Sequence, residues 1–188
     1  MIPNNTRLDL YNNSWYKPGG GPLKRLVWYF VNVVVFNHGF FPVSGLKVAL
    51  LRLFGAKIGK GVVIKPSVNI KYPWNLSIGD YAWIGEEVWI DNLAQVDIGA
   101  HCCLSQGCLL LCGNHDYSRP TFDLRVSPIT LEEGAWAGAR SILAPGSRMG
   151  THAVLAAGSV ASFALEPWTI YQGNPAKIVR SRKTNSPI

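Results

Sequence analysis

The chain has 188 residues, of which 48% are hydrophobic and 15% charged, so it is neither disordered nor too short to bury a continuous core. Lysine and arginine outnumber aspartate and glutamate by 18 to 11, which indicates an anionic partner such as nucleic acid, an anionic lipid surface or a phosphorylated cofactor. The basic residues are scattered rather than gathered on one segment with aromatic neighbours, and we therefore expect no nucleic-acid partner.

Residues 1–54 are predicted to form a polar lead-in followed by an apolar helical cap. The opening residues lack the basic-then-apolar layout of a signal peptide, which predicts a cytoplasmic location. Two apolar segments follow, at 22–36 and 46–54, and each is too short to cross a bilayer as a helix. We expect them to cap the element that follows. A peripheral contact of residues 22–54 with the inner membrane face is a second interpretation, compatible with the first.

Residues 55–165 show a repeat of six, which fits neither a helix nor an alternating strand and is typical of a parallel β-helix. The repeated aliphatic positions are Ile58, Ile64, Ile70, Ile78, Ile84, Ile90, Ile98, Leu104 and Leu110 before an interruption, and Leu131, Ala137, Leu143, Met149 and Leu155 after it. Three repeats predict one triangular coil with these side chains inside. Two spacings of eight place small insertions at corners, near Pro73 with Trp74 and near Leu93 with Ala94.

The interruption at residues 112–128 has the sequence CGNHDYSRPTFDLRVSP. Its charges and prolines cannot be wound into the coil without burying unpaired polar groups, so we expect an extruded, exposed loop. The rhythm of six ends after Val160, and residues 166–188 are predicted to form a short return segment with a basic tail.

Four cysteines lie close together, and Cys102 and Cys108 occupy the small-residue position of the repeat, which predicts burial in the core. His101 and His152 occupy surface positions of the repeat, and the histidines show no paired metal-ligand spacing, so we expect no metal. His115, between Asn114 and Asp116 at the start of the loop, is the strongest candidate for chemistry, because imidazole can accept a proton from a hydroxyl near pH 7.

Several segments together resemble the left-handed β-helix acyltransferases, most closely the colanic acid biosynthesis acetyltransferase group. They are the hexapeptides themselves, YPWNLSIGD, WIGEEVWIDNLA, SQGCLLLCGNHDY, WAGARSILAPGSRMGTHAVLAAGSV and EPWTIYQGNPAK, and they cover nearly the whole chain. The resemblance implies an all-β, left-handed parallel β-helix, a homotrimer with sites between subunits, and acetyl-CoA as the donor to a sugar hydroxyl of an exopolysaccharide or a lipid-linked saccharide precursor.

The resemblance also implies roles for individual residues. His115 is the expected general base, with Asn114 or Asp116 orienting its ring, and a backbone amide near Gly138 or Ala139 is the expected oxyanion donor. The implied contacts to CoA are Trp136, Gly138, Ala139, Ala157, Ser162 and Lys177. The family often has a basic residue after the position of Ser162, whereas this chain has Phe163, which leaves Lys177 and Arg180 as the better partners for the nucleotide phosphates.

The acceptor is expected near Glu86, Asp91 and Asn92, at the corners of the coils before the loop, because carboxylates and amides suit sugar hydroxyls. A rival mechanism in which an acetyl group passes through Cys112 stays open, since a thiol is the better nucleophile. Two other classes of protein also remain alternatives: a β-helical zinc hydratase resembling carbonic anhydrase, and a non-catalytic binding or assembly protein.

Overall fold

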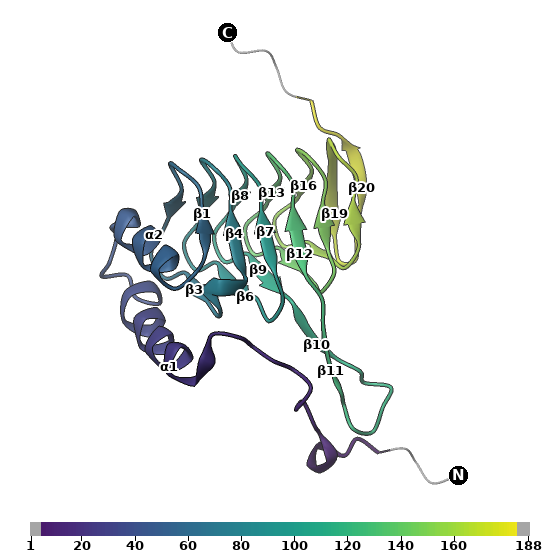
Figure 1. Cartoon of the computed structure of the whole chain (residues 1–188). Helices are drawn as coiled ribbons and strands as arrows, with labels where there is room; N and C mark the ends of the chain where they lie inside the picture. Colours follow the sequence, from purple (N-terminus) through teal and green to yellow (C-terminus); the bar gives the residue numbers. More distant parts are fainter. Residues whose placement is uncertain (1–4, 184–188) are drawn as a thin grey trace.

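A computed structural model of the chain describes residues 5–183 and shows a three-sided parallel β-helix with two helices at its N-terminal end (Figure 1). The chain visits face A, face B and face C in turn, and each strand pairs in parallel with the strand one coil later. Face A consists of β1 (Lys57–Ile58), β4 (Leu76–Ile78), β7 (Val96–Ile98), β12 (Ile129–Leu131), β15 (Arg148–Met149) and β18 (Ala164–Leu165). Face B consists of β2 (Val63–Ile64), β5 (Trp83–Ile84), β8 (Cys103–Leu104), β13 (Trp136–Ala137), β16 (Val154–Leu155) and β19 (Thr169–Gly173), with the antiparallel β20 (Ala176–Ser181) at its edge. Face C consists of β3 (Asn69–Ile70), β6 (Trp89–Asp91), β9 (Leu109–Leu111), β14 (Ile142–Leu143) and β17 (Val160–Ala161).

The structure confirms that the aliphatic residues repeated every six positions form the core of the β-helix. Each strand is so short that one or two inward side chains per face are enough to fill the coil, and from Ile64 to Leu155 every repeated aliphatic residue is buried. The small residues four places later turn the corners, and Cys102 and Cys108 are buried among them as predicted. The coils stack so closely that a Cβ on Gly138 would lie 2.6 Å from the backbone nitrogen of Ala157.

The predicted insertions lie at the corner between faces C and A, the C/A corner. Residues Pro73–Asn75 form a single 3-10 turn, η3, and Leu93 lies in a bend one coil later. The interruption leaves from the same corner one further coil along. It forms an antiparallel hairpin of β10 (Gly113–His115) and β11 (Leu124–Val126), here called the hairpin, which projects away from the coils (Figure 1). The ordered strands within this segment were not predicted from the sequence.

The N-terminal cap consists of α1 (Gly21–Val31), a π-helical turn η2 (Asn32–Phe36) and α2 (Ser44–Leu53). Its side chains bond the free edge of the first coil. The Trp28 indole donates to the Ile70 carbonyl at 2.9 Å, the Ile64 amide donates to the Ser44 hydroxyl at 2.8 Å, and the Lys47 ammonium donates to the Lys65 carbonyl at 2.7 Å. An exposed sheet edge would otherwise offer unpaired groups to another chain. The predicted capping by helices therefore has a hydrogen-bonding basis.

Neither helix of the cap, nor any other helix within residues 5–183, has the length and hydropathy needed to span a bilayer.

At the other end, the parallel pairing continues further than the rhythm of six indicated. Strand β18 pairs with β15 and β19 pairs with β16, so the last coil includes Tyr171, which is 3% exposed. The predicted end of the repeat after Val160 was therefore too early, because backbone pairing continues where the aliphatic pattern weakens. Strand β20 then folds back and covers the edge of β19. Residues 184–188 of the predicted tail and residues 1–4 of the lead-in lie outside the described chain.

Candidate functional site

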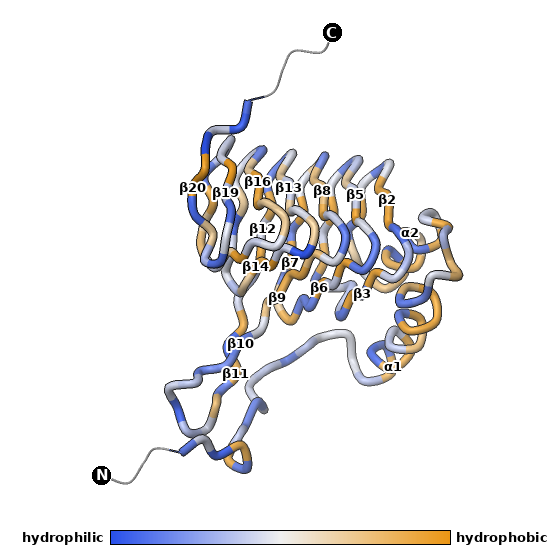
Figure 2. Tube along the Cα trace, turned by 180° about the vertical axis from the view of Figure 1, so that it is seen from behind, coloured by the Kyte–Doolittle hydropathy of each residue, from blue (hydrophilic) through white to orange (hydrophobic). Residues whose placement is uncertain are grey.

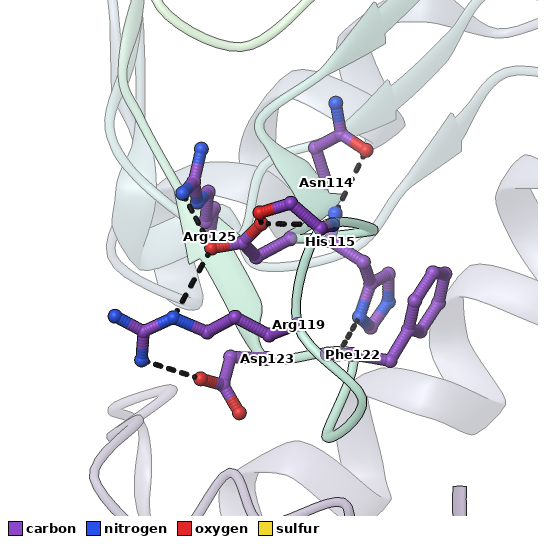
Figure 3. A network of polar contacts seen from close by, with 8 residues as sticks. Asn114, His115, Arg119, Phe122, Asp123 and Arg125 are labelled. Carbon is purple, nitrogen blue, oxygen red and sulfur yellow. Dashed lines mark hydrogen bonds and ion pairs between the residues drawn. The ribbon is translucent and has the colours of Figure 1, made fainter. Parts of the chain in front are cut away.

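His115 ends strand β10 on the hairpin, and its ring is held from two sides. The ring stacks on Phe122 with centroids 4.4 Å apart and planes 7° from parallel (Figure 3). The centroid of the Tyr11 ring lies 5.6 Å from that of the His115 ring. Nδ1 lies 2.8 Å from the Phe122 carbonyl oxygen. Because a carbonyl can only accept, this contact places the proton of a neutral ring on Nδ1 and leaves the Nε2 lone pair free. The half-buried ring is therefore held in the tautomer that a general base requires.

The residue that orients the ring is Phe122, which was not predicted from the sequence. Its backbone has φ = 51°, in the left-handed region that residues with a side chain rarely adopt. This conformation turns the hairpin and brings the Phe122 carbonyl to His115. No sequence pattern could identify the contact, since every residue has a carbonyl.

The two expected orienting residues, Asn114 and Asp116, do not contact the His115 ring. The Asn114 side chain accepts a hydrogen bond from the His115 backbone amide at 2.7 Å. The Asp116 carboxylate, 6% exposed, accepts from Ser118 and pairs with Arg125 and Arg119 (Figure 3). These bonds hold the pKa of Asp116 below its usual value, first through the Ser118 hydroxyl and then through Arg125. The prediction that either side chain orients the ring is corrected accordingly: both fix the hairpin backbone.

Most of the predicted contacts to CoA gather at another corner, between faces B and C. Gly138 and Ala139 follow strand β13, and Ala157 stands one coil later at the position of Ala139, as the bond from the Gly158 amide to the Ala139 carbonyl shows. Lys177 pairs with Gln172, which lies near the end of β19 on face B, toward the same corner of the last coil. We call this set, with Trp136 on its flank, the small-residue corner. Ser162 does not join it, because Ser162 follows strand β17 at the C/A corner.

The small-residue corner exposes backbone that an extended ligand chain can approach. Ala157 is exposed and Ala139 half-buried, and the Trp136 indole, 45% exposed, donates to the Ser105 hydroxyl at 2.9 Å. The Gly138 amide is already used, since it donates to the Leu155 carbonyl at 2.7 Å. The Ala139 amide forms no hydrogen bond with any other residue in the described part of the chain. Of the two expected oxyanion donors, only Ala139 is therefore free.

The three predicted acceptor residues have different surroundings. Asn92 is fully buried, and its side chain bonds the Tyr72 and Asn75 backbone, so it is a structural clamp and its prediction as a sugar contact is corrected. Glu86 lies at the corner between faces B and C, two coils before Ala139. Its Oε1 atom is 3.8 Å from Nζ of Lys65. Asp91 lies at the C/A corner, from which the hairpin leaves. Its Oδ1 is buried at 2.8 Å from the Lys71 ammonium, in an ion pair without an aligned hydrogen bond.

Two neighbouring cavities connect Asp91 with the surroundings of His115. The first, of about 550 Å³, lies between α1 and face C and is lined by Trp28, Tyr29, Lys71, Tyr72, Trp89 and Asp91 among others. The second, of about 370 Å³, shares Lys71 and Tyr72 with the first and is bounded by Tyr11, Tyr16, Leu93 and Leu124. Tyr11 faces the His115 ring and Leu124 is its partner in the hairpin. We call the two cavities together the face C groove.

The cysteines are all free thiols, and three of them, Cys102, Cys108 and Cys112, are buried. Burial raises the pKa of the Cys112 thiol to about 11, which disfavours the thiolate that the rival covalent mechanism needs. Cys103 is half-buried on the outer side of β8. Residues 5–183 contain no group of three or more histidine, cysteine or acidic side chains placed to hold a metal ion. His101 stacks on Tyr81 and His152 packs against Trp168, at the corner between faces A and B.

Comparison with known proteins places this arrangement among acetyltransferases. No family model matches the chain. It is 40% identical over 164 residues, 87% of its own length, to WcaF of Escherichia coli K12, covering 90% of that protein, which is provisionally named as a colanic acid biosynthesis acetyltransferase. It is 24% identical over 148 residues to the galactoside O-acetyltransferase of Escherichia coli, covering 77% of this chain and 73% of that protein. The fold matches a hexapeptide-repeat acetyltransferase of Vibrio cholerae in complex with acetyl-CoA, with a TM-score of 0.77, 24% identity and coverage of 88% and 93% of the two chains.

Proposed function

The chain belongs to the hexapeptide-repeat acetyltransferases, and from this membership we propose that it transfers the acetyl group of acetyl-CoA to a hydroxyl of a sugar, in an exopolysaccharide or a lipid-linked saccharide precursor. The names of the relatives support the class of acceptor, and the complex of the Vibrio cholerae protein supports the donor. The observation that carries the proposal is the His115 ring, whose Nδ1 is bonded to Phe122 and whose Nε2 is free.

In the proposed reaction the sugar hydroxyl loses its proton to Nε2 of His115 as its oxygen attacks the thioester carbonyl. A carbon–oxygen bond forms, the carbon–sulfur bond breaks, and the imidazolium returns the proton to the departing sulfur of CoA. The Phe122 carbonyl stabilises the imidazolium, because it accepts a hydrogen bond from Nδ1 throughout. General-base assistance of this kind contributes a factor of about 100 to 10,000 in rate.

The small-residue corner is the proposed donor site. A pantetheine arm is an extended chain with amide groups, and it can lie along backbone that carries only Gly138, Ala139 and Ala157. The Ala139 amide is the proposed oxyanion donor, where a fixed donor contributes about 3 kcal/mol to the stability of the transition state. Lys177, exposed at the end of this corner, is the proposed partner of the nucleotide phosphates.

The face C groove is the proposed acceptor site, with Asp91 as the one predicted acceptor residue that lines it. Its aromatic side chains suit the apolar faces of sugar rings, and its carboxylate, amide and ammonium groups suit hydroxyls. The two cavities have room for more than one sugar ring, which agrees with an acceptor larger than a free monosaccharide.

We further propose a homotrimer in which each site lies between two subunits. Within one chain, the hairpin leaves from the C/A corner, whereas the donor residues lie at the corner between faces B and C. Those corners are separated by face C, where the five residue-to-residue steps from Ala139 to Ala144 span roughly 16 Å when extended. The outward side chains of faces B and C include Trp83, Trp136, Trp89 and Ile142, while face A carries Lys57, Asp97 and Arg148. Two apolar faces and one polar face suit a ring of subunits.

We also propose that the protein works in the cytoplasm. The donor is a cytoplasmic metabolite, and the four free thiols fit a reducing compartment.

The test is thiol release from acetyl-CoA in the presence of candidate saccharides, measured for wild type and for His115→Ala. We expect release that depends on the acceptor, and a loss of about 100-fold or more in kcat for the variant. The matched control is His101→Ala, because His101 is an exposed histidine at another corner, and it should retain wild-type activity. Equal rates for wild type and His115→Ala, or no release with any saccharide, would contradict the proposal.

A further inference from the structure

The outer face of the N-terminal cap has an apolar surface that the folded chain leaves exposed. On α1 and η2 the exposed apolar residues are spaced three and four apart, on the side of the helix away from the core. They are Leu23 (73% exposed), Leu26 (55%), Val27 (44%), Phe30 (57%) and Val34 (52%). The opposite side of the same helix holds the buried Trp28 and Phe36. Helix α1 is therefore apolar on both sides, but only one side packs against the first coil of the β-helix.

The apolar surface continues over the turn and the second helix. Phe40 in the turn is 86% exposed, and Val43, Leu46 and Leu53 are 60%, 43% and 76% exposed. Figure 2 shows the hydrophobic colour along both helices at this end of the molecule. We call the exposed apolar residues between Leu23 and Leu53 the cap surface.

The net positive charge of the protein comes from the same part of the chain. Residues 10–79 contain nine lysines and arginines and no aspartate or glutamate, so the remaining residues carry nine basic and eleven acidic side chains. The last three of the nine, Lys60, Lys65 and Lys71, are paired with carboxylates of the next coil. The first six have no carboxylate within ion-pair distance among residues 5–183. They are Lys17, Lys24, Arg25, Lys47, Arg52 and Lys57, of which only Lys47 is buried.

We propose that the cap surface docks on an anionic lipid bilayer, with the apolar side chains of α1, the turn and α2 in the interface and the unpaired cations that are not buried, such as Lys24 and Arg25 of α1, at the headgroups. An interfacial segment of this kind combines an apolar face containing Phe and Leu with basic residues beside it, and it does not need the length of a spanning helix. Basic residues near an anionic surface strengthen such binding, and salt weakens it.

Charge argues against a second copy of the chain as the occupant. In a two-fold contact the same surface faces itself, so the unpaired cations of one cap would meet those of another with no carboxylate between them. An acidic protein is less well matched than a bilayer, because most exposed residues of the cap surface are aliphatic or phenylalanine side chains, whereas a specific protein interface carries about one hydrogen bond per 100–200 Å².

Docking would also place the proposed acceptor site close to the bilayer. This step of the inference rests on the proposed function. Leu26 and Tyr29 are exposed on α1 and also line the first cavity of the face C groove. A cap lying on a bilayer therefore brings the rim of that cavity to the surface from which a lipid-linked saccharide would extend.

The experiment is vesicle flotation of the full-length protein with two compositions, neutral phosphatidylcholine alone and phosphatidylcholine with about 30% of the anionic lipid phosphatidylglycerol. We expect flotation with the anionic vesicles, at least tenfold weaker flotation with neutral ones, and loss of binding as the salt concentration is raised. The double variant Leu23→Glu/Phe30→Glu should lose at least tenfold in binding while keeping its acetyl transfer to a soluble saccharide. The matched control is Ile178→Glu/Val179→Glu, two exposed apolar residues of β20 outside the cap, which should float like wild type.

Three results would overturn the docking proposal. They are no flotation of wild type with anionic vesicles, equal flotation of wild type and the Leu23→Glu/Phe30→Glu variant, and a lower number of subunits for that variant in sedimentation, which would assign the cap surface to contact between copies. Thiol release with soluble saccharides is measured separately, so a failure of docking and a failure of the proposed activity are distinguishable.

Discussion

At the scale of single residues, the proposed chemistry depends on a backbone carbonyl. The Phe122 carbonyl fixes which nitrogen of His115 carries the proton, and it is in place because Phe122 adopts a positive φ. Such conformations persist only where the surroundings enforce them. Here the stacking of Phe122 on the imidazole and the ion pairs of Asp116 hold the turn.

Replacing Cys112 with alanine should leave turnover within about twofold of wild type. With a thiol pKa of about 11, only about one Cys112 side chain in ten thousand is ionised at pH 7, and the residue is fully buried. Steady-state kcat and KM with acetyl-CoA and a saccharide check this expectation. An inactive but folded variant would restore the mechanism with an acetyl-cysteine intermediate.

Asp116 should stabilise the protein in a pH-dependent way. Its pKa is lowered in the folded state, so its contribution is fully present above the ordinary carboxyl pKa near 4 and is lost as the pH falls through the folded pKa. Asp116→Asn should therefore be less stable than wild type at pH 7 and at pH 5, and the difference should shrink below about pH 4. Urea unfolding of both proteins across this range measures it, and a constant difference at every pH would contradict the assignment.

At the scale of elements, the hairpin is an addition to a coil that is complete without it. Its strands pair with each other, and the chain enters and leaves it at neighbouring points, since the Ser127 amide donates to the Cys112 carbonyl at 2.9 Å. Each coil is instead stabilised by its inward aliphatic residues, which contribute about 1.5 to 3 kcal/mol each through burial.

Replacing residues 113–126 with a short glycine linker should therefore abolish acetyl transfer while leaving the β-helix folded. We expect an unchanged far-ultraviolet circular dichroism band and a Tm within a few degrees of wild type. As a comparison, Leu110→Ala removes a fully buried side chain of β9 and should cost about 2 to 5 kcal/mol of unfolding free energy. Loss of the fold on excision of the hairpin would show that the hairpin is part of the folding unit.

At the scale of the whole molecule, the proposed base His115 and the proposed donor corner lie far apart within one chain, and this separation predicts a site shared between subunits. His115→Ala and Ala157→Trp should each be inactive alone, because one lacks the base and the other blocks the small-residue corner. In mixed trimers that contain both variants, about one site in three should be restored, since each shared site needs one intact contribution from each of two neighbours and a mixed ring has one such interface among its three.

The measurement is the specific activity of the mixed assembly after purification through a tag on each variant. A site contained within one chain would give no recovery, because every chain in the mixture carries one defect.

Local pattern was enough to predict the solenoid, the burial of Cys102 and Cys108, the corners at Pro73 and Leu93, and the departure of the chain near His115. The reason is that a β-helix repeats one short-range rule, an inward aliphatic residue every six positions, and any failure of the rule shows directly in the sequence. The match of motifs added the family, which the 40% identity to WcaF confirms. Neither the local pattern nor the match of motifs could tell that Asn92 is a buried clamp whereas Asp91 lines a cavity, because both are polar residues at one corner.

The tertiary structure alone decided which groups meet. The contact of the Phe122 carbonyl with His115, the approach of Tyr11 to the same ring, and the bonding of the first coil's edge by Trp28, Ser44 and Lys47 join residues between 7 and 104 positions apart. None of them follows from a repeat, because each depends on where the irregular segments return to the coil. The sequence by itself determined the coil through side-chain periodicity, and long-range packing decided the proton position on His115 and which outer surfaces of the molecule stay exposed.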